Sequence, residues 1–426
     1  MTRIALALLV LLSASAALAQ LRGHGGPVRA LAIAPDGRTA ISGSFDSSAI
    51  RWSLTRNAAE QVLRHHDSAV NAVVFAAGSR IVTGGEDGRI AIWQPGAAAP
   101  ERVLEGHTAP IAALAVSPDG NTIASASWDR TVKLWPLAGG APQTLEGHQQ
   151  NVNGVAFTPD GRALVSAAYD LTVRIWPLRS GSAAVVTLPT PLNAVAVAPD
   201  GEIVAGGADG RVFFLSPSGE LRAEAETSGT PIIAIAASRD GALVAAAGIR
   251  GSVAIFERRT RTLARTLVGP GLPVWSAAFF PDSRTLLTGG TDRMVRRWNA
   301  ITGDHIGSVA MADADDPLAP FAGDRGAEVY RACIACHTLT PDEGNRAGPT
   351  LAGIFGRKIA TLPGYDFSPA LKKLDIVWTP ETVAKLFEVG PMAYTPGTKM
   401  PEQKIGSAAD REALVKFLAR ATARSK

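Results

Sequence analysis

Residues 106–135 read GHTAPIAALAVSPDGNTIASASWDRTVKLW, and this stretch contains every element of a pattern that recurs through most of the chain. It opens with Gly106-His107 and closes with Trp135. Between them lies Pro118-Asp119-Gly120, and Pro followed by Asp-Gly is typical of a tight β-turn. The segments around the turn alternate between apolar and polar residues with a period of two, which predicts β-strands.

The pattern returns about every 41 residues between residues 21 and 300. An aromatic or apolar residue closes each unit, at Trp52, Trp93, Trp135, Trp176, Leu215, Phe256 and Trp298. An acid stands six residues before the closing residue, except in the sixth unit, which has Arg250. Seven units of four short strands predict a closed ring, because closure removes exposed sheet edges.

Units one to four share two further residues at constant spacing. A histidine precedes the closing tryptophan by 27 or 28 residues, and a hydroxyl residue precedes it by ten. The histidines are His24, His66, His107 and His148, and the hydroxyl residues are Ser42, Thr83, Ser125 and Ser166. The repeat resembles the WD-repeat β-propeller. The resemblance implies that His, Ser/Thr, Asp and Trp form a hydrogen-bonded tetrad in each blade, so we interpret these histidines as structural.

The remaining units depart from this pattern. The seventh has Thr288 but no histidine, and units five and six have Ala205 and Ala246 in place of the hydroxyl residue. We expect residues 304–310 to supply the outer strand of the last blade, because residues 20–23 are barely long enough for a strand.

The first 19 residues have the character of an export signal. Thr2-Arg3 is followed by the apolar run Ile4–Leu12, and Ala17-Leu18-Ala19 is a small-x-small cleavage site. Nine apolar residues fall short of the ~20 that span a bilayer. We therefore expect a signal peptide cleaved after Ala19, a periplasmic protein and no membrane span.

The composition indicates a folded chain assembled from two parts. Of 426 residues, 46% are hydrophobic and 19% charged, which excludes a disordered protein. The formal net charge of +4 alone argues neither for nor against nucleic acid, and we expect no nucleic-acid partner. Lys133 is the only lysine before residue 323, whereas eight lysines follow it. Residues 20–310 are predicted to form the propeller, the acidic, proline-containing residues 311–322 a linker, and residues 323–426 a second domain.

The second domain contains Cys333-Ile334-Ala335-Cys336-His337, and Cys-x-x-Cys-His is the attachment signature of a c-type haem. A thioredoxin-like redox pair, half of a zinc site and a disulfide are the alternatives. The sequence shows no βαβ context for a redox pair. A zinc site needs two more ligands, but the chain has no other cysteine and no other histidine after His305.

Residues 323–426 resemble a class I cytochrome c, an all-α domain. The matching runs include Gly348-Pro349, Gly356-Arg357-Lys358, Pro363-Gly364-Tyr365, Trp378 and residues 394–400. The resemblance implies one covalent haem c, attached through Cys333 and Cys336. His337 would be the proximal and Met400 the distal iron ligand.

The resemblance also assigns roles around the haem. Pro349 would accept a hydrogen bond from His337, and Thr398 would lie beside Met400. The haem propionates would be surrounded by Arg357, Tyr365 and Trp378. Gly326 and Tyr330 would pack on the C-terminal helix. Met392 is the rival distal ligand, but it precedes Pro396-Gly397, so we interpret it as a packing or surface residue.

These patterns support an exported c-type cytochrome that transfers electrons through a His/Met-ligated haem. Its propeller would dock protein partners, and redox partners would bind at the haem edge, the propeller face or both. The alternative is a propeller-based periplasmic oxidoreductase with the cytochrome domain as a built-in electron acceptor. A third possibility is a regulatory binder whose haem senses redox state. No acid–base cluster stands out in the propeller, so whether the protein is an enzyme stays uncertain and electron transfer is preferred.

Overall fold

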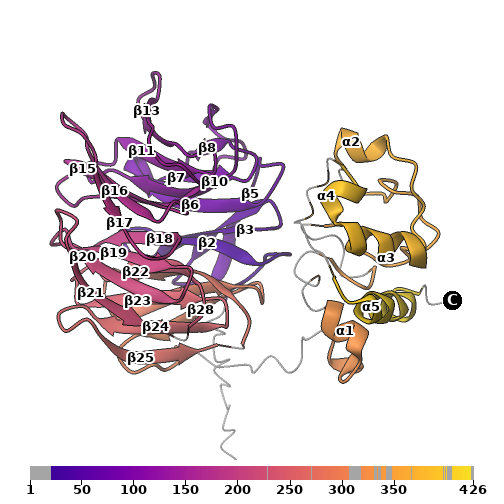
Figure 1. Cartoon of the computed structure of the whole chain (residues 1–426). Coiled ribbons are helices and arrows are strands. Elements are labelled where there is room, and N and C mark those ends of the chain that lie inside the picture. The colour runs from indigo at the N-terminus through magenta and orange to yellow at the C-terminus, as the bar shows by residue number, and fades with distance from the viewer. Residues whose placement is uncertain are drawn as a thin grey trace, which may run out of the picture.

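The computed structural model describes residues 21–227, 229–269, 271–306, 318–330, 333, 337–341, 348–365, 367–396, 398, 400 and 405–423. The predicted signal peptide and Cys336 lie outside the described residues. Two bodies are seen, a seven-bladed propeller and a smaller helical domain (Figure 1). The expected architecture, a seven-bladed β-propeller followed by an all-α domain, is confirmed.

Each blade is a four-stranded antiparallel sheet. In blades one to six the strands follow the chain order from the inside outward, whereas β1 is the outermost strand of blade seven. Blades one to four comprise β2 (Val28–Ile33), β3 (Thr39–Ser44), β4 (Ser48–Ser53), β5 (Ala58–Arg64); β6 (Val70–Ala76), β7 (Arg80–Gly85), β8 (Ile90–Trp93), β9 (Arg102–Leu104); β10 (Ile111–Val116), β11 (Thr122–Ser127), β12 (Val132–Pro136), β13 (Gln143–Leu145); and β14 (Val152–Phe157), β15 (Ala163–Ala168), β16 (Thr172–Pro177), β17 (Ala184–Thr187). A short 3-10 helix, η1 (Ala77–Ser79), joins β6 to β7.

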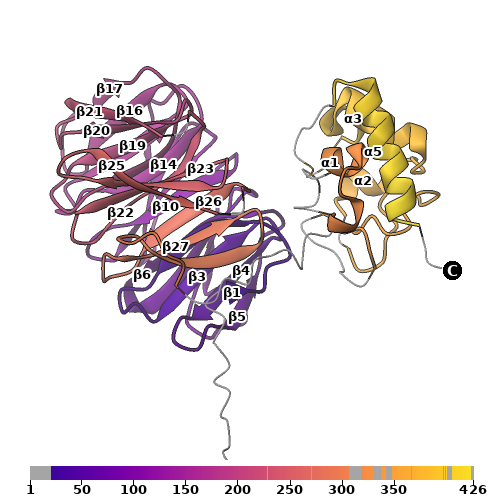
Figure 2. The ribbon, with the colours of Figure 1, turned by 90° about the horizontal axis from the view of Figure 1, so that it is seen from below.

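Blades five to seven comprise β18 (Leu192–Val197), β19 (Ile203–Gly207), β20 (Arg211–Leu215), β21 (Leu221–Glu226); β22 (Ile232–Ala237), β23 (Leu243–Gly248), β24 (Ser252–Glu257), β25 (Thr262–Val268); and β26 (Val274–Phe279), β27 (Thr285–Gly290), β28 (Met294–Asn299) with β1 (Leu21–Arg22). The first strand of each blade packs on the first strand of the next, and β26 packs on β2, which closes the ring (Figure 2).

The expected closure of the last blade by residues 304–310 is wrong. Strand β1 takes that place, with Leu21 opposite Val295 on β28. Leu21 is only 2% exposed, and it packs among apolar side chains of the first and last blades, including Trp52. This burial stabilises a strand of only two residues. His305 forms an isolated bridge with Trp298, and the centroids of the two rings are 3.6 Å apart.

The four predicted tetrads are present. In blade three, His107 Nδ1 lies 2.7 Å from Asp129 Oδ2 and its Nε2 lies 2.7 Å from Ser125 Oγ. Trp135 Nε1 donates to the same Oγ at 2.8 Å. The sets that begin at His24, His66 and His148 have the same connections. Each polar side chain therefore has a partner inside its blade, which confirms the structural interpretation of these histidines.

In blades with an incomplete tetrad, arginine side chains form ion pairs with the acidic residues. In blade seven, Arg296 forms an ion pair with Asp292, and in blade five Arg211 Nε lies 2.6 Å from Asp209 Oδ2. Blades five and six share a further network. Glu202, 2% exposed, lies 3.0 Å from Arg258 and 2.8 Å from Arg261. Because a buried carboxylate is costly without partners, these arginines stabilise the blades that lack the tetrad.

The helical domain contains η2 (Ala319–Phe321), α1 (Arg325–Tyr330), α2 (Pro369–Lys372), α3 (Pro380–Val389), α4 (Pro391–Tyr394) and α5 (Ala408–Ala421). A capping box between Thr379 and Thr382 starts α3, and the Ser407 hydroxyl accepts from the Asp410 amide at the start of α5. Within the described residues, no helix is long and apolar enough to cross a bilayer.

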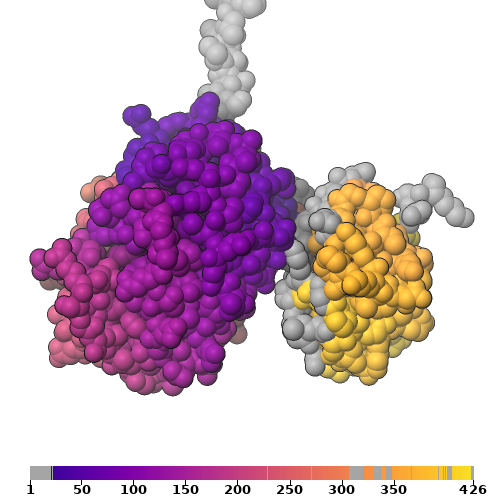
Figure 3. All heavy atoms as spheres, turned by 90° about the horizontal axis from the view of Figure 1, so that it is seen from above, coloured from indigo at the N-terminus to yellow at the C-terminus, as the bar shows by residue number. Residues whose placement is uncertain are grey.

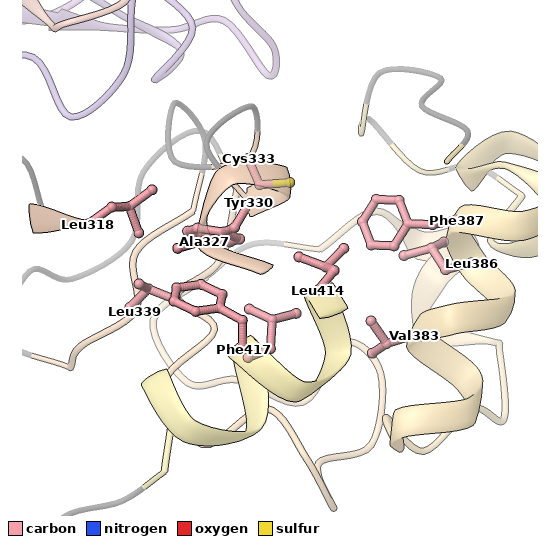
Figure 4. Packing of buried hydrophobic residues seen from close by; sticks show 11 residues of the cluster. Leu318, Ala327, Tyr330, Cys333, Leu339, Val383, Leu386, Phe387, Leu414 and Phe417 are labelled. Carbon is pink, nitrogen blue, oxygen red and sulfur yellow. The ribbon is translucent and has the colours of Figure 1, made fainter. Parts of the chain in front are cut away.

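Helices α1 and α5 cross in close contact, as the sequence predicts. A Cβ on Gly326 would lie 2.5 Å from Phe417 Cβ and would also collide with the Ala413 carbonyl. The ring centroids of Tyr330 and Phe417 are 5.4 Å apart, within the apolar cluster of Figure 4. Leu318, from the segment predicted as a linker, is 2% exposed and belongs to this cluster. The glycine thus allows the two helices to enclose one core.

Candidate functional site

A cavity of about 500 Å³ opens in the helical domain. It brings together all the predicted site residues that the structure describes, namely Cys333, His337, Pro349, Arg357, Tyr365, Trp378, Thr398 and Met400. Cys333 follows α1, and its side chain points to the side of the domain where Leu386 and Phe387 of α3 lie (Figure 4). These three residues and Leu414 of α5 contribute to the cavity wall.

His337 is held in one orientation. Its Nδ1 donates to the Pro349 carbonyl oxygen at 2.8 Å, which leaves Nε2 as the nitrogen available to a metal. The backbone is held as well, because the His337 amide donates to the Cys333 carbonyl at 3.0 Å and Tyr330 Oη donates to the His337 carbonyl at 3.1 Å. A hydrogen bond from Nδ1 to a carbonyl fixes the tautomer and raises the basicity of the other nitrogen.

Gly348 is a site residue that the sequence analysis did not single out. A Cβ at this position would lie 2.7 Å from His337 Nδ1 and 2.9 Å from its Nε2, so that only glycine lets the backbone pass the imidazole face. The Gly348-Pro349 pair is visible in the sequence. The close approach of Gly348 to the His337 ring could not be predicted without the three-dimensional path of the loop.

Met400 lies at the end of a short hydrogen-bonded segment. Its amide donates to Thr398 Oγ1 at 3.1 Å, and the Thr398 amide donates to the Thr395 carbonyl at 3.0 Å. The Thr395 amide and hydroxyl both donate to the Pro391 carbonyl of α4, each at 2.8 Å. Thr398 thus holds the Met400 backbone through its hydroxyl. The Met392 side chain lies outside the described residues.

Three of the predicted site residues that line the cavity, Arg357, Tyr365 and Trp378, carry hydrogen-bond donors. The Arg357 guanidinium donates to the carbonyls of Thr350, at 2.9 Å, and Ala352, at 3.2 Å. The Trp378 amide donates to the Arg357 carbonyl at 2.9 Å. The Tyr365 ring lies edge-on to Phe367, with centroids 4.7 Å apart. These contacts order a loop that contains three donor-bearing side chains.

The cavity has the properties that a haem requires. Apolar side chains dominate its wall, namely Leu351, Ile354, Ile359, Val383, Leu386, Phe387, Leu414 and Leu418. A histidine nitrogen and a methionine sulfur in one apolar cavity are a ligand pair that suits haem iron. Among the described residues, no group of three or more His, Cys, Asp or Glu side chains could hold a different metal. The residues present therefore fit a haem.

The propeller also contributes to this cavity wall, which the sequence did not predict. The contributing residues come from blades one and two and include Phe45, Arg64, Asp67, Ser68 and Glu86. Figure 3 shows the helical domain as a separate, smaller body beside the propeller. Repeat spacing predicts the blades, but it contains no information about which blades face a domain that follows them.

Family models match both the propeller and the helical domain. Residues 69–315 match the family described as "IFT122 first beta-propeller", and residues 16–53 match "WD domain, G-beta repeat". Residues 323–422 match the family described as "Cytochrome c".

Individual relatives agree with the match at the C-terminal end. The chain is 39% identical to "Cytochrome c" of Cochliobolus lunatus over 99 residues, which are 23% of this chain and 91% of that protein. It is 40% identical to "Cytochrome c" of Arabidopsis thaliana, over 22% of this chain and 84% of that protein. With "Cytochrome c 2.1" of Caenorhabditis elegans it shares 39% identity, over 24% of this chain and 95% of that protein. The chain therefore belongs to the β-propeller family described as "IFT122 first beta-propeller", and its C-terminal domain belongs to the cytochrome c family.

Proposed function

We propose that this protein is an exported electron carrier with one haem c. The haem would be attached through Cys333 and Cys336, with His337 and Met400 as its axial ligands. The observation that supports this proposal best is the hydrogen bond from His337 Nδ1 to Pro349, in the cavity that Met400 also lines. It leaves His337 Nε2 as the ring nitrogen for iron.

A haem with nitrogen and thioether ligands exchanges single electrons and has no open coordination position for a substrate. The protein contributes orientation and surroundings. Pro349 fixes the imidazole, and Gly348 lets the loop pass it closely. The apolar wall excludes water, which favours the less charged, reduced state of the centre. Arg357, Tyr365 and Trp378 would supply donors to the haem propionates.

We place this activity in the periplasm. The apolar run Ile4–Leu12 and the Ala17-Leu18-Ala19 site support export, with cleavage after Ala19. The propeller would serve as the docking platform for protein partners, an inference from the fold. A tethered domain experiences an effective partner concentration in the millimolar range when the propeller is bound. The propeller would therefore increase the rate of electron exchange with a dilute partner.

Haem staining of the denatured protein tests the cofactor assignment. The full-length protein, produced with haem-attachment machinery, should retain one haem per chain on a denaturing gel. The Cys333→Ser/Cys336→Ser variant should retain none. A second haem, or stoichiometric zinc in place of haem, would overturn the proposed site. Reversible one-electron reduction by a chemical reductant, without turnover of a substrate, is the expected activity.

A further inference from the structure

The cavity of the helical domain opens onto one part of the propeller. Propeller residues reach its wall from the turn between β3 and β4, from the end of β5 and the segment that joins it to β6, and from the turn between β7 and β8. All three segments belong to blades one and two. We call the exposed or half-buried side chains Phe45, Arg64, Asp67 and Glu86 on these segments the blade 1–2 rim.

The charges on the two sides of the cavity are complementary. The propeller contributes Asp46, Asp67 and Glu86 to the wall, against one basic side chain, Arg64. The described residues of the helical domain contribute Arg357 and Lys358 and no acid. Asp67 also pairs with Arg89 of the propeller and Lys358 with Asp375, which reduces the charge on both sides, and Glu86 contributes to the same wall as Asp67. Such complementarity orients two surfaces and weakens as salt screens it.

Phe45 gives the rim an apolar side chain that is held in place by its neighbours. Its ring lies edge-on to Trp275 of blade seven, with centroids 5.8 Å apart. Trp275 is held in turn by a hydrogen bond from its Nε1 to Thr291 at 2.8 Å and by the Arg29 guanidinium, 5.5 Å from the ring centroid. An aromatic side chain that is already ordered loses little entropy on binding, which makes it a typical anchor of an interface.

We propose that the blade 1–2 rim is the docking site for the haem-bearing face of the chain's own cytochrome c domain. In the docked state the open side of the cavity lies against the propeller. An external redox protein then competes with the propeller for that side of the haem. The inference rests on the proposed function only in requiring a haem in this cavity.

Small-angle X-ray scattering of the full-length haem protein tests the docking. Asp67→Lys/Glu86→Lys reverses the acidic part of the rim. Glu220→Lys/Glu226→Lys makes the same change of charge at exposed positions beside and on β21, on the side of the propeller away from the helical domain (Figure 1). At low salt the rim variant should have a larger radius of gyration and maximum dimension than the wild type, while the control variant matches the wild type. The wild type should expand in the same way in roughly 1 M salt, where the Debye length falls to about 3 Å.

The rate of haem reduction by ascorbate gives a second measurement. Phe45→Ala changes no charge, so a faster reduction would reflect a more accessible haem. We expect at least a threefold increase at low salt, an unchanged absorption spectrum, and no increase for Phe157→Ala, which truncates a half-buried phenylalanine on β14 of blade four.

The two proposals fail in different ways. If the rim variants match their controls in both scattering and reduction rate, the docking site is refuted, although the electron-carrier function stands. If the purified chain lacks haem, the proposed function fails, and the absorption spectrum reveals this before any scattering is measured.

Discussion

The imidazole Nδ1 of His337 lies 2.8 Å from the carbonyl oxygen of Pro349, and the residue before this proline is a glycine whose missing Cβ leaves room for the same ring. One dipeptide therefore performs two tasks. Pro349 fixes the orientation of the imidazole through its carbonyl, and Gly348 lets the backbone come close enough for that carbonyl to reach Nδ1. The cavity depends on backbone geometry as much as on the side chains proposed to bind iron.

The first prediction concerns this close approach. Gly348→Ala places a methyl group against the His337 ring, and overpacking of this kind costs about 1–3 kcal/mol of stability. We expect lower haem content, and in the haem-loaded fraction a changed reduction potential, because the ring must move away from its hydrogen bond to Pro349. Potentiometric titration measures the change. Gly406→Ala is the matched control, since a Cβ there meets no atom within 4 Å.

The second prediction assigns the distal ligand. Met400→Ala should open a coordination position, so that the reduced protein binds carbon monoxide, which the wild type excludes. The sulfur-to-iron absorption band should disappear in the same variant. Met392→Ala should keep the band and exclude carbon monoxide. The opposite pattern would transfer the ligand role to Met392.

The third prediction concerns acid stability of the propeller. Burial alone would raise the pKa of Asp46 and of Asp87, but hydrogen bonds and charge from His24 and His66, with help from Ser48 and Arg89, lower both pKa values to about 2. The unfolded chain, with a normal Asp pKa, binds more protons between pH 4 and 2, so stability is lost as the pH falls through this window. The loss should be roughly 2 kcal/mol per carboxyl.

Urea unfolding at several pH values, followed by tryptophan fluorescence, measures this loss. Seven of the chain's eight tryptophans lie in the propeller, so the signal reports mainly on that domain. Asp46→Asn should be less stable at neutral pH and should lose less stability between pH 4 and 2. An equally steep loss in this variant would contradict the assignment.

The fourth prediction concerns the buried ion network of blades five and six. Glu202→Ala removes a 2% exposed carboxylate and leaves Arg258 and Arg261 without it. Breaking such a pair on one side costs about 3–5 kcal/mol. Glu101→Ala removes an exposed partner of Arg80, 40% accessible, and should cost about 1 kcal/mol or less. Urea unfolding of the two variants checks the difference, and equal losses would show that burial of Glu202 does not matter.

Repeat spacing in the sequence was sufficient to predict the seven blades and a motif search to find the Cys-x-x-Cys-His segment, and the resemblance to the WD repeat predicted the four tetrads. Each tetrad joins residues that lie within 28 positions of one another, as from His107 to Trp135. Strand pairing and turns inside a blade also join residues that are close in sequence. The spacing of residue types is therefore nearly sufficient to predict the structure of a blade. The crossing of α1 and α5 was also predictable, because the family resemblance placed Gly326 at the contact.

Tertiary structure alone decided the features that join distant parts of the chain. Leu21 pairs with Val295 because an apolar side chain at position 21 is buried between the first and last blades. No feature of the sequence near either residue predicts this pairing. Arg296 replaces the missing histidine in blade seven because it is the cation that reaches Asp292. The positions of Gly348 against His337, and of Phe45 and Glu86 in the wall of the cavity, likewise depend on contacts between distant parts of the chain. Hydrogen bonds between residues that are close in sequence can be predicted from the spacing of residue types. Which side chains are buried, and which surfaces fit together, depends on packing between residues that are far apart in sequence.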